Sequence, residues 1–206
     1  MKNKTSVEKA RTTFTWIFGI LIAFLLFFTE PVPMIDKPLF EGLFMLGGCT
    51  CAVIGALGRA WASLFISGKK DQTLIHVGPY ANCRNPLYFF SFIGSLGVGL
   101  GSETITIPTV IVIMFVIYYK LVIKDEEKRL EELFGEEYRS YKAKTPCFFP
   151  KFNGATSKLD DHYDVNPRIF YRRLFDCAWF VIFLGILELS EAMNELNWLP
   201  SLFKIY

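Results

Sequence analysis

Long apolar runs, separated by short polar connections, dominate the pattern of this 206-residue chain. A helix of about 20 residues crosses the hydrocarbon core of a bilayer, which is about 30 Å thick. Four runs are predicted to be membrane helices, at about residues 13–29, 39–66, 86–100 and 105–123, and a weaker fifth run covers about 174–189. The pattern therefore predicts an all-α fold: a polytopic membrane helix bundle of four to five transmembrane helices, with residues 1–206 forming a single domain.

The connections between the runs carry signals that end helices. Pro31, Pro33 and Pro38 separate the first two runs, and a short turn at 101–104 joins the third run to the fourth. The first run follows a basic start, as in a signal peptide, but no small residues mark a cleavage site after it. We therefore expect this run to remain as a membrane helix.

Basic residues gather on one side of the predicted spans. They precede the first run and follow the second and the fourth: Lys2, Lys4, Lys9, Arg11, Lys69, Lys70, Lys120, Lys124, Lys128 and Arg129. Short loops that are rich in Lys and Arg face the cytoplasm in membrane proteins. We expect an integral, multi-pass membrane protein whose amino terminus and segments 67–85 and 124–173 face the cytoplasm.

The composition narrows the possible functions. Hydrophobic residues make up 52% of the chain and charged residues 20%, which excludes a disordered protein. The formal net charge of +2 gives no strong field, so we expect no nucleic-acid partner. Five scattered cysteines do not indicate a disulfide framework, and the Cys49-x-Cys51 pair has no ligand-spaced histidine. We predict no metal site.

Small residues line one side of the third run. Gly94, Gly97 and Gly101, together with Ser91 and Ser95, allow the backbone of a neighbouring helix to approach closely. We expect that neighbour to be the fourth run, because the two runs form a hairpin. The alternative is that the glycines make room for a ligand.

The polar segment 72–88 brings several functional groups to the start of the third run. Gly78–Pro79 predicts a turn, and Arg84-Asn85-Pro86 opens the helix. With Tyr80 and Tyr88, a cation, an amide and two hydroxyl groups converge on a helix amino terminus, which attracts carboxylates. The alternative is that Arg84 and the tyrosines only anchor the helix at the membrane interface.

The segment 124–141 predicts an amphipathic helix that continues the fourth run on the cytoplasmic side. Its apolar stripe is formed by Ile123, Leu130, Phe134, Tyr138 and Tyr141. Glu127 interrupts this stripe, and Glu126 lies at its edge. A carboxylate on a buried face needs a partner or a ligand, so these two glutamates are better candidates for chemistry than their solvated neighbours.

Three motifs in this order and spacing resemble a known family. The first, Arg59-Ala60-Trp61-Ala62, lies near the end of the second run. The second consists of Gly78-Pro79-Tyr80 followed by Arg84-Asn85-Pro86-Leu87-Tyr88, at the start of the third run. The third follows the fourth run and consists of Glu126-Glu127-Lys128-Arg129-Leu130, Phe134-Gly135-Glu136-Glu137-Tyr138 and Tyr141, ending at Pro146 and Pro150. The chain is similar to the integral-membrane methyltransferases related to isoprenylcysteine carboxyl methyltransferase and to the phospholipid methyltransferases. The resemblance covers about residues 59–150 and leaves out the polar segment and fifth run within 151–206.

The resemblance implies methyl transfer from S-adenosyl-L-methionine to a lipid or lipidated acceptor that reaches the site from the bilayer, with either an isoprenylcysteine carboxylate or a phospholipid amine as the methylated group. It implies that the cofactor contacts Gln72, Thr73, Leu74, Ile75, Tyr80, Asn85, Pro86, Leu87 and Tyr88. It places Arg84, Glu126 and Glu127 at the reaction. The family usually has a histidine where this chain has Asn85, so a titratable ring is lost there while a donor and an acceptor remain.

Two other classes of protein share some of these features. Reductases that use NADPH on a related membrane scaffold are longer and have more spans than this chain. A non-catalytic membrane scaffold or channel would explain the apolar runs but not two polar motifs on the same face. A soluble methyltransferase is not indicated, because no glycine-rich turn follows a predicted strand.

Overall fold

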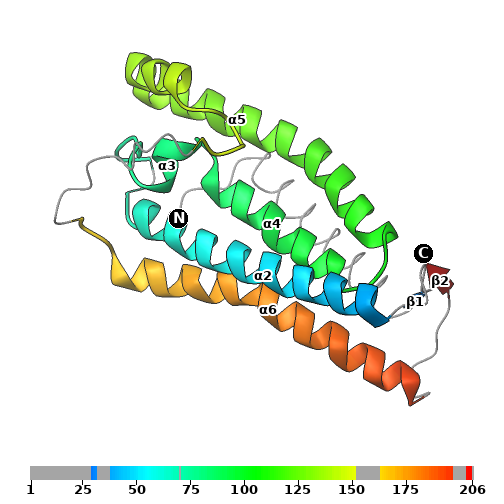
Figure 1. Ribbon diagram of the computed structural model, residues 1–206. Helices are drawn as coiled ribbons and strands as arrows, with labels where there is room; N and C mark the ends of the chain where they lie inside the picture. The colour runs from blue at the N-terminus through cyan, green and yellow to red at the C-terminus, as the bar shows by residue number, and fades with distance from the viewer. Residues whose placement is uncertain (1–28, 32–37, 70, 152–162, 197–202, 206) are drawn as a thin grey trace.

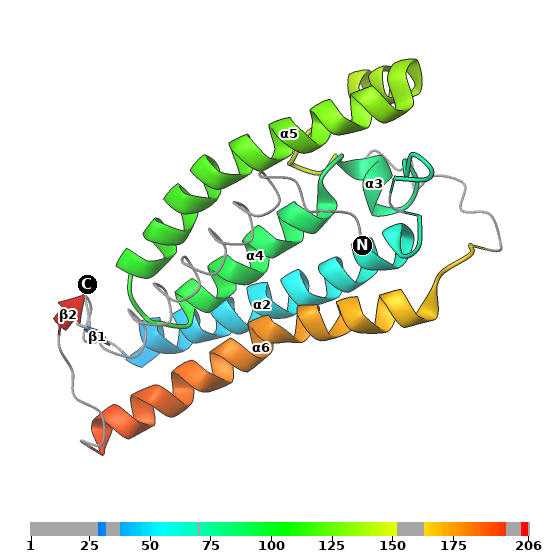
Figure 2. The ribbon, with the colours of Figure 1, turned by 180° about the vertical axis from the view of Figure 1, so that it is seen from behind.

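The computed structural model describes residues 29–31, 38–69, 71–151, 163–196 and 203–205. Its long helices are α2 (Pro38–Ile66), α4 (Pro86–Leu100), α5 (Thr106–Lys144) and α6 (Pro167–Glu195), and a short helix, α3 (Pro79–Asn82), precedes α4. Figures 1 and 2 show α4 between α5 and α2, with α6 running along the other side of α2. The second to fifth predicted runs thus correspond to helices.

The predicted all-α fold has one exception in the described residues. β1 (Thr29–Pro31) and β2 (Phe203–Ile205) form a short parallel pair, in which Thr29 is opposite Phe203. Each strand has only three residues, and their pairing depends on segments near opposite ends of the chain, so no local pattern predicts it. The first predicted membrane helix, except for Thr29, lies outside the described residues.

Two of the described helices are long and apolar enough to cross a membrane, over Leu39–Ile66 and within Thr106–Lys144. Helix α4 is apolar but only 15 residues long. Large apolar side chains on α2, including Leu43, Leu46 and Leu57, are exposed, which is typical of a surface that faces lipid. The described residues therefore form a helical bundle with two candidate membrane spans, and the count of four to five spans stays a prediction.

The predicted stripe of Gly94, Gly97 and Gly101 packs against α2 and α6, not against α5 as expected. Gly99, which is not part of that stripe, lies against Pro108 and Ile111 of α5. A Cβ added at Gly48 of α2 would lie 2.8 Å from the carbonyl oxygen of Gly97, and Gly97 in turn lies against the backbone of Ala52. Gly94 of α4 lies against Gly55. Because both helices carry small residues at these contacts, their backbones approach closely along most of α4, whereas α5 offers larger apolar side chains to that helix.

Helix α5 changes direction at Gly135. This residue has φ 52° and ψ −122°, which is not helical, and open space surrounds the position of a Cβ. In a straight helix Lys142 would lie about 22 Å along the axis from Glu127, yet their side chains form an ion pair of 3.2 Å. The segment that follows Gly135 therefore turns back along the helix, and Tyr138 and Tyr141 reach the site from the returning part.

Candidate functional site

The described residues enclose a cavity of about 1140 Å³ at the end of the bundle where α3 precedes α4. All nine residues predicted to contact the cofactor line it: Gln72, Thr73, Leu74, Ile75, Tyr80, Asn85, Pro86, Leu87 and Tyr88. Of the three candidate catalytic residues, Arg84 and Glu126 line the cavity, whereas Glu127 is not among the lining residues. The structure thus brings residues from two distant polar segments to one place.

Two hydrogen bonds to backbone carbonyls fix the cavity wall between α3 and α4. The amide of Arg84 donates to the carbonyl of Pro146 at 2.9 Å, and the hydroxyl of Tyr141 donates to the carbonyl of Tyr80 at 2.6 Å. Gly78, with φ 60°, lies against the ring of Phe65, where a Cβ would collide with the aromatic carbons. The turn before α4 is therefore held against the segment that follows α5.

Arg84 and Glu127 form a buried clamp across this wall. The Nε and Nη2 atoms of Arg84 both contact Oε1 of Glu127, at 2.8 and 2.7 Å, and each side chain is 11% exposed. Nη1 of Arg84 donates to the carbonyls of Lys142 (2.9 Å) and Thr145 (2.6 Å). Arg84 thus uses most of its donors on the protein itself.

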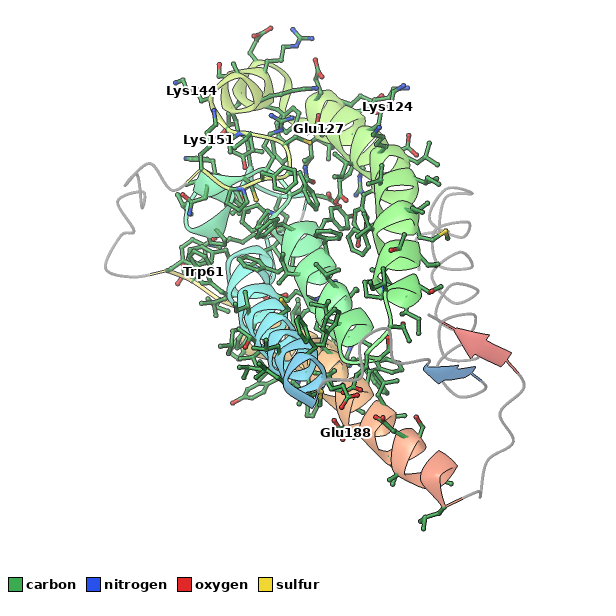
Figure 3. The ribbon with its side chains drawn as sticks, turned by 45° about the vertical axis from the view of Figure 1, so that its right-hand side comes forward. Trp61, Lys124, Glu127, Lys144, Lys151 and Glu188 are labelled. Atoms are coloured by element: carbon green, nitrogen blue, oxygen red, sulfur yellow. The ribbon has the colours of Figure 1, made fainter. Side chains whose placement is uncertain are left out.

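The charge of Glu127 is compensated on both of its oxygens, because Lys142 lies 3.2 Å from Oε2. Figure 3 shows Glu127 on the inner side of α5, toward the returning part of the helix, while Lys124 points away from the bundle. Burial alone would raise the pKa of Glu127, but hydrogen bonds and charge from Arg84 and Lys142 outweigh burial and hold the pKa below its usual value. Glu127 is therefore ionised at neutral pH.

Glu126 has a different environment from its neighbour. It is half-buried and lines the cavity, and its Oε2 accepts a hydrogen bond of 2.6 Å from the hydroxyl of Tyr88. The ring of Tyr88 meets Tyr119 edge to face, with centroids 4.8 Å apart. Of the two adjacent glutamates, Glu126 thus faces the cavity, and Glu127 joins α5 to the turn before α4.

Tyr80 brings a buried hydroxyl to the cavity. Its side chain is 7% exposed, and its Oη has no hydrogen-bond partner among the described residues. Burial first, and then the charge of Glu126, raise the pKa of Tyr80 far above its usual value, so the hydroxyl keeps its proton. A buried donor without a partner is rare in native proteins, and it can be satisfied by a ligand.

Asn85 stands at the start of α4, where it is 9% exposed. Its amide nitrogen donates to the carbonyl of Cys147 at 3.0 Å, which holds the side chain against the segment after α5. The hydrogen bonds of this side chain to Cys147 use only the amide nitrogen, and the amide oxygen of Asn85 remains as an acceptor at the cavity. An asparagine therefore keeps a fixed, non-titrating polar group at this position.

Several residues that line the cavity lie outside the polar segments 72–88 and 124–141. Arg59 belongs to a motif that marks the family resemblance, and Ser91 lies on the small-residue side of α4, but Arg173, Asp176 and Phe180 come from α6. Among the residues that the structure describes, no group of three or more His, Cys, Asp or Glu side chains gathers as a metal site would require.

Comparison with known proteins shows which family this fold and cavity belong to. The phospholipid methyltransferase family matches residues 42–137, which run from α2 into α5 and include Arg84 and both glutamates. The chain is 34% identical over 166 residues to the nickel-cobalt-cadmium resistance protein NccN of Alcaligenes xylosoxydans xylosoxydans, a match that covers 81% of this chain and 76% of that protein. The chain belongs to the phospholipid methyltransferase family.

A second relative is the cobalt-zinc-cadmium resistance protein CzcN of Cupriavidus metallidurans. It is 35% identical over 159 residues, and the match covers 77% of this chain and 70% of that protein. No solved structure matches the chain. The family match ends before α6, so the wall that α6 adds to the cavity lies outside the matched residues.

Proposed function

We propose that this protein is an integral-membrane methyltransferase that uses S-adenosyl-L-methionine and acts on a lipid or lipid-like acceptor. The observation that carries the proposal is the cavity itself, because every residue that the family resemblance assigns to the cofactor lines it, together with Glu126. Membership of the phospholipid methyltransferase family supports the reaction class. The exposed apolar surface of α2 supports an acceptor that arrives from the membrane.

The residues present fit the cofactor. S-adenosyl-L-methionine supplies a methyl group on a positively charged sulfur. The unsatisfied hydroxyl of Tyr80 offers a donor, the amide oxygen of Asn85 offers an acceptor, and Leu87 offers an apolar surface. Ligand cavities usually measure about 300–1000 Å³, so a volume of about 1140 Å³ has room for a cofactor and part of an acceptor.

The main task of the protein in such a reaction is to align donor and acceptor and to exclude water. In our proposal the clamp of Arg84 and Glu127 helps to align donor and acceptor indirectly, because it fixes the turn before α4 against the end of α5. Arg84 and Glu127 are then positioning residues. Glu126 is the catalytic candidate, because its carboxylate lines the cavity and is oriented by Tyr88.

The role of Glu126 depends on the acceptor. An amine or a thiol must lose a proton before or during methylation, and Glu126 would accept it at the oxygen that Tyr88 leaves free. A carboxylate acceptor is already ionised at neutral pH, so Glu126 would then act by position and charge. We expect Glu126→Gln to lower turnover about 100-fold or more with an amine or thiol acceptor.

The test uses detergent-solubilised full-length protein and two readouts. S-adenosylhomocysteine should raise the midpoint of thermal unfolding, because a ligand that binds only the folded state stabilises it. Glu126→Gln should keep this stabilisation and lose transfer of labelled methyl groups to membrane lipids, and the exposed Glu132→Gln should keep both. Failure of S-adenosylhomocysteine to bind the wild type would contradict the proposal, and stabilisation by NADPH would favour the reductase class.

The names of the two relatives add a physiological setting to the proposal. Both relatives are named for resistance to metals that include cobalt and cadmium. We propose that this chain would contribute to such resistance by methylating a membrane component. Cells that carry the Glu126→Gln variant should then be as sensitive to cobalt as cells without the protein, and full resistance with this variant would disconnect the phenotype from methyl transfer.

A further inference from the structure

A second group of charged side chains lines the cavity on α2 and α6. Arg59 comes from α2, Arg173 and Asp176 come from α6, and Ser63 and Ser91 add hydroxyl groups. Two cations and one anion give this wall a formal charge of +1. The proposed roles of Tyr80, Asn85 and Glu126 use none of these residues.

Arg59 is held in place but keeps unused donors. Its Nη1 donates to Oγ of Ser91, whose own hydroxyl donates to the carbonyl of Leu87 at 2.6 Å. The guanidinium carbon lies 5.8 Å from the centroid of the Phe180 ring. The Nε atom is buried and has no hydrogen-bond partner among the described residues. The side chain is therefore fixed by three helices while part of its hydrogen-bonding capacity remains open.

The positive charge at this wall has no close counter-charge in the described part of the chain. None of the ion pairs found there, within 4.0 Å, includes Arg59 or Arg173. The thiol of Cys177 interacts with Arg59, but a thiol is mostly neutral at pH 7. Arg84 differs, because its donors are occupied by Glu127 and by two carbonyls. Arg59 is half-buried and its buried Nε atom has no partner among the described residues, whereas Arg173 is exposed on α6. An anionic ligand between them would give the Nε donor a partner and both cations a counter-charge.

The surroundings of Arg59 indicate an amphiphile more than a small soluble anion. Arg59 lies seven residues before the end of α2 at Ile66, about 10 Å along the helix axis, in a helix that is long and apolar enough to span a membrane. Met114, Phe115 and Phe180 add apolar surface to the same cavity. An anionic group beside Arg59 would thus have apolar surface next to it for a hydrocarbon chain.

We propose that Arg59 and Arg173 form a subsite for the anionic group of the methyl acceptor, a phosphate or a carboxylate at the head of a lipid-like molecule. This inference rests on the proposed methyltransferase function and names its substrate class. The planar guanidinium group matches the oxygens of both phosphate and carboxylate. Because α6 lies outside the matched residues 42–137, Arg173 would make acceptor choice a property of the carboxyl-terminal helix.

The experiment measures binding of three probes to the full-length protein in a neutral detergent, by thermal stabilisation. Phosphatidylethanolamine presents a phosphate, S-farnesylcysteine presents a carboxylate, and diacylglycerol is the uncharged control. The variants are Arg59→Gln and Arg173→Gln. The matched control is Arg172→Gln, because Arg172 is exposed on the same helix and does not line the cavity.

We expect the wild type to bind at least one anionic probe and not diacylglycerol. Arg59→Gln and Arg173→Gln should each weaken that binding about tenfold or more, because each removes a charge-assisted contact, and Arg172→Gln should bind like the wild type. The probe that loses affinity identifies phosphate or carboxylate as the recognised group. Unchanged affinity in both variants, or equal binding of diacylglycerol by the wild type, would overturn the subsite.

Binding of S-adenosylhomocysteine is measured in parallel in every variant. It reports whether the variant is folded, and we expect Arg173→Gln to bind it as the wild type does. If Arg59→Gln does not fold, Arg173→Gln still decides the question. A wild type that fails to bind S-adenosylhomocysteine overturns the methyltransferase proposal alone, and the lipid probes then decide independently whether an anionic subsite exists.

Discussion

Arg84 and Glu127 lie 43 residues apart in the chain and meet in a buried ion pair, with Nη2 and Oε1 2.7 Å apart. The pair joins the turn before α4 to the polar half of α5. Since the same guanidinium also binds two carbonyls after Gly135, one side chain holds together three segments around the cavity. The stability of the site should therefore depend on this pair more than on any of the exposed ion pairs.

The first prediction concerns the energy of this pair. Arg84→Ala or Glu127→Ala alone should lower the free energy of unfolding by about 3–5 kcal/mol, because each leaves a buried charge without the partner that neutralises it most closely. The double variant should lose less than the sum of the two, since neither charge then remains. Thermal unfolding of the solubilised wild type, the two single variants and the double variant measures this double-mutant cycle. The control is Arg139→Gln, which breaks exposed pairs with Glu131 and Glu136 and should have no measurable effect.

The second prediction follows from the lowered pKa of Glu127. A carboxyl group with a lower pKa in the folded state contributes stability above its ordinary pKa, about 4.3, and loses that contribution as the pH falls through the folded-state pKa. The difference in unfolding midpoint between the wild type and Glu127→Gln should therefore be constant near neutral pH and shrink below about pH 4. A difference that stays constant down to pH 3 would contradict the assignment.

The third prediction tests the unsatisfied hydroxyl of Tyr80. Tyr80→Phe removes a buried donor without a partner in the described residues, so the unliganded protein should be as stable as the wild type or more stable. If the hydroxyl binds the cofactor, affinity for S-adenosylhomocysteine should fall about tenfold. Titration followed by thermal stabilisation measures both effects. Tyr171→Phe, at an exposed position of α6, is the control, and equal affinity in both variants would place the cofactor elsewhere.

The fourth prediction concerns the reversal of α5 at Gly135. Its φ of 52° is in the left-handed region, so Gly135→Ala should cost about 1–2 kcal/mol although the space around the Cβ is empty. Gly185 also has open space, but it lies within α6 without a positive φ. Gly185→Ala should therefore stabilise the protein by up to about 1 kcal/mol. Equal effects of the two substitutions would mean that α5 continues straight.

The fifth prediction concerns orientation, which we expect from the basic flanks of the apolar runs. The turn between α4 and α5 and the end of α5 lie at opposite ends of the bundle (Figure 1). In a variant without the native cysteines, Ser102→Cys should react with impermeant reagents from outside the cell, and Lys144→Cys should react only after the membrane is opened. Reaction of both from the same side would contradict the orientation and the cytoplasmic cavity.

Local sequence signals predicted most of the helices because those signals act within a few residues. Pro86 sets the start of α4, and the apolar run that ends at Ile66 sets the end of α2. The fifth apolar run is predicted over 174–189, but α6 extends from Pro167 to Glu195. Its polar first turns are capped by Asn166, whose side-chain oxygen accepts a hydrogen bond from the amide of Ile169, and Pro167 occupies the first helical position. Propensity and hydrophobicity thus determine where helices form better than how far they extend.

The sequence by itself determined which polar segments carry the site. Only the tertiary structure decided which glutamate faces the cavity, that the glycine stripe of α4 meets α2 and α6, and that α6 supplies Arg173 to the wall. Glu126 and Glu127 are neighbours in the chain, and their side chains differ in direction by about 100° on a helix. The reversal at Gly135 and the packing of α6 then determine what each one meets. Spacing along a chain fixes a face of a helix, but only packing between distant segments fixes what lies opposite that face.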